Sequence, residues 1–189
     1  MDPLTRRAVD RRLARQYSVA SLEQLLSDGL TYAEWRWQIA SGAWIVVGEQ
    51  VVRVAAAATS WHQSALAACL TVPGALASRR TAGALWGFAG SRRGLIEVTV
   101  PRWDRRHRVA FRVHETRDLS DLDRAQVDGI PVTSPVRTLI DLAESLPFER
   151  LEEALDDAER RTCSRPPTSR FGSSSWPRGF GAASPGCGN

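Results

Sequence analysis

The chain has 189 residues, of which 43% are hydrophobic and 24% are charged, and its formal net charge is +4. This length and apolar content predict a globular protein with either one domain of ordinary size or two small ones. No apolar run reaches the ~18 residues that a membrane helix needs, and the N-terminus is too polar for a signal peptide. We therefore expect a cytoplasmic protein without a membrane partner.

Composition also excludes several kinds of site. All 25 basic residues are arginine, and the absence of lysine excludes a Walker P-loop and the standard PD-(D/E)xK nuclease site. Cys69, Cys163 and Cys187 lack metal-ligand spacing, so neither a zinc site nor a disulfide framework is predicted. Charge is uneven, because residues 79–117 contain ten arginines and three acids, whereas residues 118–161 contain five arginines and twelve acids.

The first 56 residues show the element order of a winged helix-turn-helix. A basic helix is predicted over residues 2–16, and a short helix follows from Ser21. After a glycine turn, Thr31 caps a second helix over residues 32–41, and Glu34 completes a capping box. Two β-rich runs around a Gly-Glu-Gln turn come next and predict the hairpin that forms the wing.

A DNA-binding domain of this kind places its second motif helix in the major groove, and the wing then contacts the backbone. The predicted DNA-binding residues are Thr31, Tyr32, Arg36, Gln38 and Arg53. An alternative stays open, because Tyr32, Trp35 and Ile39 fit one helical face, which places some of these side chains in the core. Winged helices also serve as protein-interaction modules, in which case Arg36 is only a solvated side chain.

Residues 57–161 predict a small mixed α/β domain. Helices are expected over 61–70 and 76–86, paired strands over 95–100 and 109–114, a basic loop over 102–108 and an acidic turn over 118–123. A short extended piece at Ile130–Val132 leads to Ser134, which caps a helix from Pro135 to Ala143. A last helix covers residues 148–161. Arg79, Arg80 and the basic loop either contact phosphates or pair with the acidic half of the chain, and we favour pairing.

Residues 162–189 differ from the rest of the chain. More than half of them are Ser, Pro or Gly, and none is acidic, so we expect a disordered tail. If these residues are assigned GC-rich codons, another reading frame turns residues 162–176 into an Ala/Leu-rich stretch that suits a continued helix. We hypothesise that a frameshift near Arg161 produced this tail.

Histidines and acids give no convincing catalytic or metal site. None of His62, His107 and His114 stands within ligand spacing of another His or Cys, and His114 is expected to be a structural hydrogen-bonding residue. The acids around Asp121 lack the Gly and Glu placement of a calcium loop. We predict no catalytic residue, no metal, no cofactor and no enzymatic activity.

Five segments together resemble the AbiEi-type antitoxins of type IV toxin-antitoxin systems in actinobacteria, over residues 18–161. They are Gly42-Ala-Trp-Ile-Val-Val-Gly, Ala77-Ser-Arg-Arg-Thr-Ala-Gly-Ala-Leu-Trp-Gly-Phe, Ile96-Glu-Val-Thr-Val-Pro-Arg, Val113-His-Glu-Thr-Arg-Asp-Leu and Gly129-Ile-Pro-Val-Thr-Ser-Pro-Val-Arg-Thr-Leu-Ile-Asp-Leu-Ala. The resemblance implies a winged helix that binds operator DNA, represses its own operon, and precedes a domain that antagonises a nucleotidyltransferase-like toxin.

Many relatives of this kind carry a C-terminal Vsr-like nuclease domain, and this chain stops before such a domain could begin. The wing also ends in Gln50-Val-Val-Arg rather than the Gly-Val-Tyr-Arg-like ending of relatives. We therefore expect a DNA-binding antitoxin whose partners are double-stranded operator DNA and a toxin encoded nearby, with the oligomeric state left open. The alternatives are an inactive remnant of a nuclease-fused protein and a protein-interaction module without a DNA role.

Overall fold

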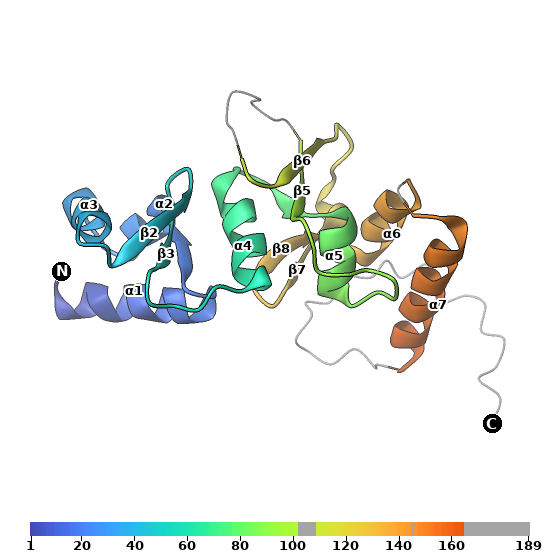
Figure 1. The fold of residues 1–189 in the computed structure, drawn as a ribbon, viewed down its shortest axis with the longest axis horizontal. Coiled ribbons are helices and arrows are strands. Elements are labelled where there is room, and N and C mark those ends of the chain that lie inside the picture. Colours follow the sequence, from blue (N-terminus) through green and yellow to red (C-terminus); the bar gives the residue numbers. More distant parts are fainter. Residues whose placement is uncertain (102–108, 145, 165–189) are drawn as a thin grey trace.

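The computed structural model describes residues 1–101, 109–144 and 146–164, and its fold belongs to the expected α+β class (Figure 1). The expected basic loop at 102–108 lies outside the described residues, as does the expected disordered, frameshifted tail from residue 165 onward. Thr162, Cys163 and Ser164, which were also assigned to that tail, form the end of the last helix.

The N-terminal part contains three helices and a three-stranded antiparallel sheet. In chain order its elements are α1 (Pro3–Arg15), β1 (Val19–Ser21), α2 (Leu22–Ser27), α3 (Tyr32–Ala40), β2 (Trp44–Gly48) and β3 (Val51–Val54). The strand order is β1-β3-β2, so β3 is central and β2 forms an edge. The helices and the hairpin expected for this part are present, and β1 is an additional short strand that the sequence did not predict.

Each of these helices begins at a capping residue. Asp2 accepts hydrogen bonds from the backbone of the first turn of α1, and Ser21 and Thr31 form capping boxes with Gln24 and Glu34. Behind the caps, apolar side chains from all three helices and the sheet meet in one buried cluster, which includes Val9, Leu13, Leu25, Leu30, Trp35, Trp44 and Val52. The N-terminal part therefore has a core of its own.

Of the remaining residues, the described ones (57–101, 109–144 and 146–164) build a five-stranded mixed sheet and four further α-helices. The elements are α4 (Trp61–Thr71), β4 (Leu76–Ala77), α5 (Arg79–Trp86), β5 (Glu97–Val100), β6 (Arg112–Glu115), the short 3-10 helix η1 (Asp121–Asp123), β7 (Arg124–Val127), β8 (Ile130–Thr133), α6 (Pro135–Ala143) and α7 (Phe148–Ser164). The strand order is β6-β5-β4-β8-β7. The two predicted strands β5 and β6 do pair, and they run parallel.

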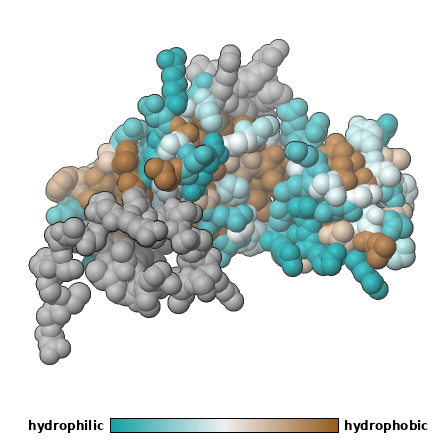
Figure 2. Space-filling view, turned by 180° about the vertical axis from the view of Figure 1, so that it is seen from behind, coloured by the Kyte–Doolittle hydropathy of each residue, from teal (hydrophilic) through white to brown (hydrophobic). Residues whose placement is uncertain are grey.

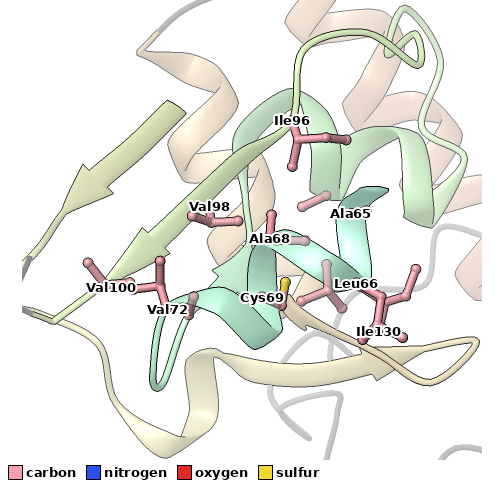
Figure 3. Close-up of a cluster of buried hydrophobic side chains, with 13 residues drawn as sticks. Ala65, Leu66, Ala68, Cys69, Val72, Ile96, Val98, Val100 and Ile130 are labelled. Atoms are coloured by element: carbon pink, nitrogen blue, oxygen red, sulfur yellow. The ribbon is translucent and has the colours of Figure 1, made fainter. Parts of the chain in front are cut away.

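The main core of this second part lies between α4 and the five-stranded sheet. Figure 3 shows Ala65, Leu66, Ala68 and Cys69 of α4 gathered with Val98 and Val100 of β5 and Ile130 of β8. Ala65, Val98, Val100 and Ile130 are fully buried. The alternation of Val98 and Val100 in β5 explains this arrangement, because residues two apart on a strand point to the same face.

One expectation for this part is wrong. Residues 76–86 do not form one helix, since Leu76 and Ala77 form the central strand β4 and α5 begins only at Arg79. Ala77 pairs with Val98 and Val132 on its two sides, and a short apolar run does not reveal such tertiary pairing. The structure also contains β7, a strand that the sequence did not predict, which pairs antiparallel with β8.

Helix α4 lies between the two sheets and contacts both (Figure 1). Its Ala67 packs with Val19 and Val51 of the three-stranded sheet, while its other face covers the five-stranded sheet. The side chain of Gln63 donates a hydrogen bond to the carbonyl oxygen of Tyr17 at 2.8 Å. The hydroxyl of Tyr17 in turn donates to the carbonyl oxygen of Asp128 at 3.0 Å, which joins the two parts directly.

Among the helices of the described segments, none combines the length and the apolar character that are needed to span a bilayer.

Candidate nucleic-acid interface

The first turn of α3 is held by the predicted capping box. The Glu34 backbone N–H donates to Thr31 Oγ1 at 3.3 Å, and the Thr31 backbone N–H donates to Glu34 Oε2 at 2.9 Å. Glu34 also pairs with the Met1 ammonium. This ammonium, together with Thr31, lowers the pKa of Glu34 to about 2. Both polar side chains are thus used to fix the start of the helix.

The two faces of α3 differ sharply in exposure. Trp35 is 6% exposed and packs edge-on against Trp44 with ring centroids 5.9 Å apart. Trp37 follows Trp35 by two residues, which on a helix with 3.6 residues per turn places it on the opposite side. Trp37 is 64% exposed and Tyr32 is 59% exposed, and Arg36 is exposed with them. The outward face of α3 is therefore aromatic and carries one cation.

The structure brings some of the predicted DNA-binding residues together on this face and not others. Tyr32 and Arg36, four residues apart, share the outward face, whereas Gln38 is only partly exposed. Thr31 sits at the helix start with its hydroxyl engaged by Glu34. Sequence reasoning weighed only Tyr32, Trp35 and Ile39 as one helical face and did not consider Trp37. The helical offset from Trp35 was the signal that could have revealed it.

Arg53 lies on the central strand β3 rather than at the tip of the hairpin. Its Nη1 donates hydrogen bonds to the carbonyl oxygens of Val54, Ala55 and Ala57 at 3.2, 3.5 and 3.4 Å. The guanidinium thereby holds the chain that leads from the hairpin toward α4. Nη1 of Arg53 is therefore engaged within the protein, and the predicted DNA contact of this residue stays a prediction.

A second group of polar and charged side chains lies on the side of the larger sheet that faces α5 and α6. Nε2 of His114 lies 2.7 Å from Oε2 of Glu97, so its partner is neither of the acids that follow it in sequence. Nε of Arg137 donates to Oδ1 of Asp141 at 2.8 Å. Burial raises the pKa of Asp141, although Arg137 acts in the opposite direction.

A further contact joins the two helices on this side of the sheet. Arg79, expected to pair within the fold, donates to Glu144 Oε2 at 2.7 Å, which links α5 to the end of α6. Within the described segments, no group of three or more His, Cys, Asp or Glu side chains is placed to hold a metal ion. Arg137 satisfies Oδ1 of the buried Asp141, whereas Oδ2 of Asp141 and Nε of Arg79 are buried without a hydrogen-bond partner among the described residues.

A comparison with known protein families gives a match for the second part of the chain. Residues 66–165 match the family model described as the AbiEi antitoxin C-terminal domain, which is more than half of the chain. No curated protein matches the chain.

Proposed function

We propose, because the chain belongs to the AbiEi antitoxin family, that it is the antitoxin of a type IV toxin-antitoxin system and acts as a DNA-binding autorepressor. Residues 1–56 are proposed to form a winged helix that binds double-stranded operator DNA. Residues 57–161 are proposed to antagonise a nucleotidyltransferase-like toxin whose gene lies nearby. We propose that both proteins act in the cytoplasm. The AbiEi antitoxin family is not an enzyme family, and we propose that this chain likewise works without catalysis.

The outward face of α3 is the observation that carries the DNA-binding proposal. In the order α1, β1, α2, α3, β2, β3, the helix α3 occupies the place of the recognition helix and β2 with β3 the place of the wing. Arg36 forms no ion pair with any described residue, so its donors are available. Arginine donates to guanine edges or phosphates, and the exposed rings of Tyr32 and Trp37 suit apolar contact with thymine methyl groups.

Fluorescence anisotropy with the DNA upstream of the gene tests this proposal. The wild-type complex is expected to weaken as salt rises, because phosphate contacts release counterions. Arg36→Ala should lower the affinity about 5- to 150-fold, which corresponds to a contact worth about 1–3 kcal/mol. Arg117→Ala is the matched control, since Arg117 is exposed on the second part of the chain. No salt-sensitive complex, or one that Arg36→Ala leaves unchanged, rules out DNA recognition by α3.

The antitoxin activity needs a separate measurement. Co-expression with the adjacent toxin gene should restore growth, and Arg36→Ala should retain this protection while it loses repression of an operon reporter. An inactive remnant of a nuclease-fused protein would show neither property. Growth that is not restored by the wild-type chain contradicts the antitoxin proposal, whatever the DNA-binding result.

A protein-interaction module is the second candidate, and one observation favours it. Exposed apolar side chains occur both on α3, at Trp37, and on the edge strand β2, where Ile45, Val46 and Val47 are 40%, 54% and 38% exposed. Exposed apolar side chains that gather into a patch often mark protein contacts. Trp37→Ala separates the two candidates: loss of DNA affinity supports the repressor, whereas unchanged DNA affinity with loss of a co-purifying protein supports the interaction module.

A further inference from the structure

Helix α1 carries a row of arginines on the side that faces away from the core. Val9 and Leu13 are its buried residues, at 1% and 7% exposure. Each of Arg7, Arg11 and Arg15 stands two residues from Val9 or Leu13, which on an α-helix is a rotation to nearly the opposite side. All three are exposed. At a spacing of four residues, successive guanidinium groups start about 6 Å apart along the helix axis. We call Arg7, Arg11 and Arg15 the arginine row.

The arginine row is not neutralised by the protein itself. None of the three side chains forms an ion pair with another residue of the described segments. Arg12, on the flank of the same helix, behaves differently, because its Nη2 donates to Asp28 Oδ1 at 2.8 Å and its Nε also pairs with Asp28. The protein therefore uses one arginine of α1 for its own structure and leaves the row free for a partner.

Contacts with the α2–α3 turn fix the position of the row. Arg12 binds Asp28 in that turn, and an added Cβ at Gly29 would come within 3.0 Å of Thr5 Oγ1. The Met1 ammonium, just before α1, pairs with Glu34 in the first turn of α3. These contacts place the N-terminal end of α1 beside the start of α3, and the row runs from Arg7 to Arg15 along the same helix, which is about 20 Å long. Figure 2 shows hydrophilic surface gathered at this end of the molecule.

We propose that the arginine row of α1 is a second, sequence-independent contact with the phosphate backbone of double-stranded DNA. This inference rests on the proposed DNA-binding function and extends it to a surface outside α3 and the wing. Arginine forks bind phosphate oxygens in pairs of hydrogen bonds, and a regular row of them suits a backbone of evenly spaced charges. A membrane surface fits poorly, because the apolar face of α1 is buried in the core and only Leu4 is left exposed.

The salt dependence of binding measures this contact. Each phosphate neutralised adds about 0.9 to the slope of log affinity against log salt. Replacing all three arginines with glutamine should therefore reduce that slope by about 2.7. Between about 50 mM and about 200 mM salt, the affinity advantage of the wild type over this variant should shrink by about 40-fold. The loss should be similar for operator DNA and for an unrelated duplex.

The test compares four full-length proteins by anisotropy on the upstream DNA and on an unrelated duplex of equal length. They are the wild type, R7Q/R11Q/R15Q, R7K/R11K/R15K and the charge-matched control R92Q/R112Q/R117Q, whose replaced arginines are exposed on the second part of the chain. Circular dichroism confirms that each is folded. The proposal expects a reduced slope for R7Q/R11Q/R15Q alone, with the lysine variant close to the wild type.

The outcomes separate this proposal from the proposed function. If the wild type prefers the upstream DNA but R7Q/R11Q/R15Q keeps its slope, the arginine row is excluded as a DNA contact while operator binding stands. If both duplexes are bound equally with a row-dependent slope, the row is supported and operator recognition fails. If the slope falls equally in the control variant, net charge alone causes the effect, and the proposed phosphate contact of α1 is overturned. Absence of any complex overturns both proposals.

Discussion

Gly48 lies at the end of β2, close to α4. A substitution that adds one methyl group at this position should push the hairpin and α4 apart. A Cβ built on Gly48 would lie 1.9 Å from Thr71 Oγ1 and 3.0 Å from both Thr71 Cβ and Cγ2. Rotation of Thr71 does not solve this, because its Cβ is itself too close. Its hydroxyl also donates to the carbonyl oxygen of Ala67 at 2.7 Å. Gly48→Ala therefore requires β2 and the end of α4 to move apart.

Overpacking of this kind costs about 1–3 kcal/mol. For a chain of this size, a loss of about 2 kcal/mol lowers the melting temperature by about 4–8 °C. Thermal unfolding followed by circular dichroism measures the change. Gly94→Ala is the matched control, since its added methyl group would meet nothing within 4 Å, and its melting temperature should stay near that of the wild type.

A second substitution tests the cause. Thr71→Ala removes Oγ1 and Cγ2, so it should restore part of the stability of Gly48→Ala and give a coupling energy in a double-mutant cycle. Two results would refute close packing of the hairpin on α4 as the cause. One is a melting temperature of Gly48→Ala equal to that of the wild type, and the other is a loss of stability that simply adds to the loss in Thr71→Ala.

Three further predictions concern the core and the start of α3. Leu142→Ala should cost about 2–5 kcal/mol in a urea titration, because Leu142 is fully buried and its loss leaves a cavity; a cost below about 1 kcal/mol would contradict this packing. Glu34 has a folded pKa of about 2, below its ordinary value of 4.5, so its contribution to stability is present above pH 4.5 and is lost as the pH falls toward 2. Glu34→Gln should flatten this part of the stability profile, and an unchanged profile would exclude Glu34 as its source. Burial raises the pKa of the Cys69 thiol to about 12; in a C163S/C187S background a thiol reagent at pH 8 should react only after denaturant is added, and rapid labelling of the native protein would show that Cys69 is accessible.

Local signals made much of the N-terminal part predictable from the sequence. Ser21 and Thr31 are followed three residues later by Gln24 and Glu34, and both pairs form the capping boxes that this spacing indicates. Pro135 after Ser134 likewise begins α6 where expected. Such signals depend on backbone groups within one turn of the chain, so the sequence alone contains them.

Features that depend on distant partners could not be read in this way. Leu76–Ala77 becomes a strand only because β5 and β8 lie on its two sides. His114 finds Glu97 through the parallel pairing of β5 and β6, and their side chains are seventeen positions apart. For the candidate interface, the sequence predicted DNA contacts by Tyr32 and Arg36, and both side chains are exposed in the structure. Sequence reasoning did not consider Trp37, although the two-residue offset from Trp35 places that side chain on the opposite side of the helix.

The placement of α4 bears on how the protein can be divided for experiments. The match to the antitoxin family begins at residue 66, inside α4 (Trp61–Thr71). A fragment cut there loses Ser60, whose side chain caps the helix, and Gln63, which holds the carbonyl oxygen of Tyr17. Even a fragment that starts before Ser60 uncovers Ala67, which packs against Val19 and Val51 of the smaller sheet. We therefore expect the excised antitoxin domain to aggregate unless the N-terminal part is kept with it.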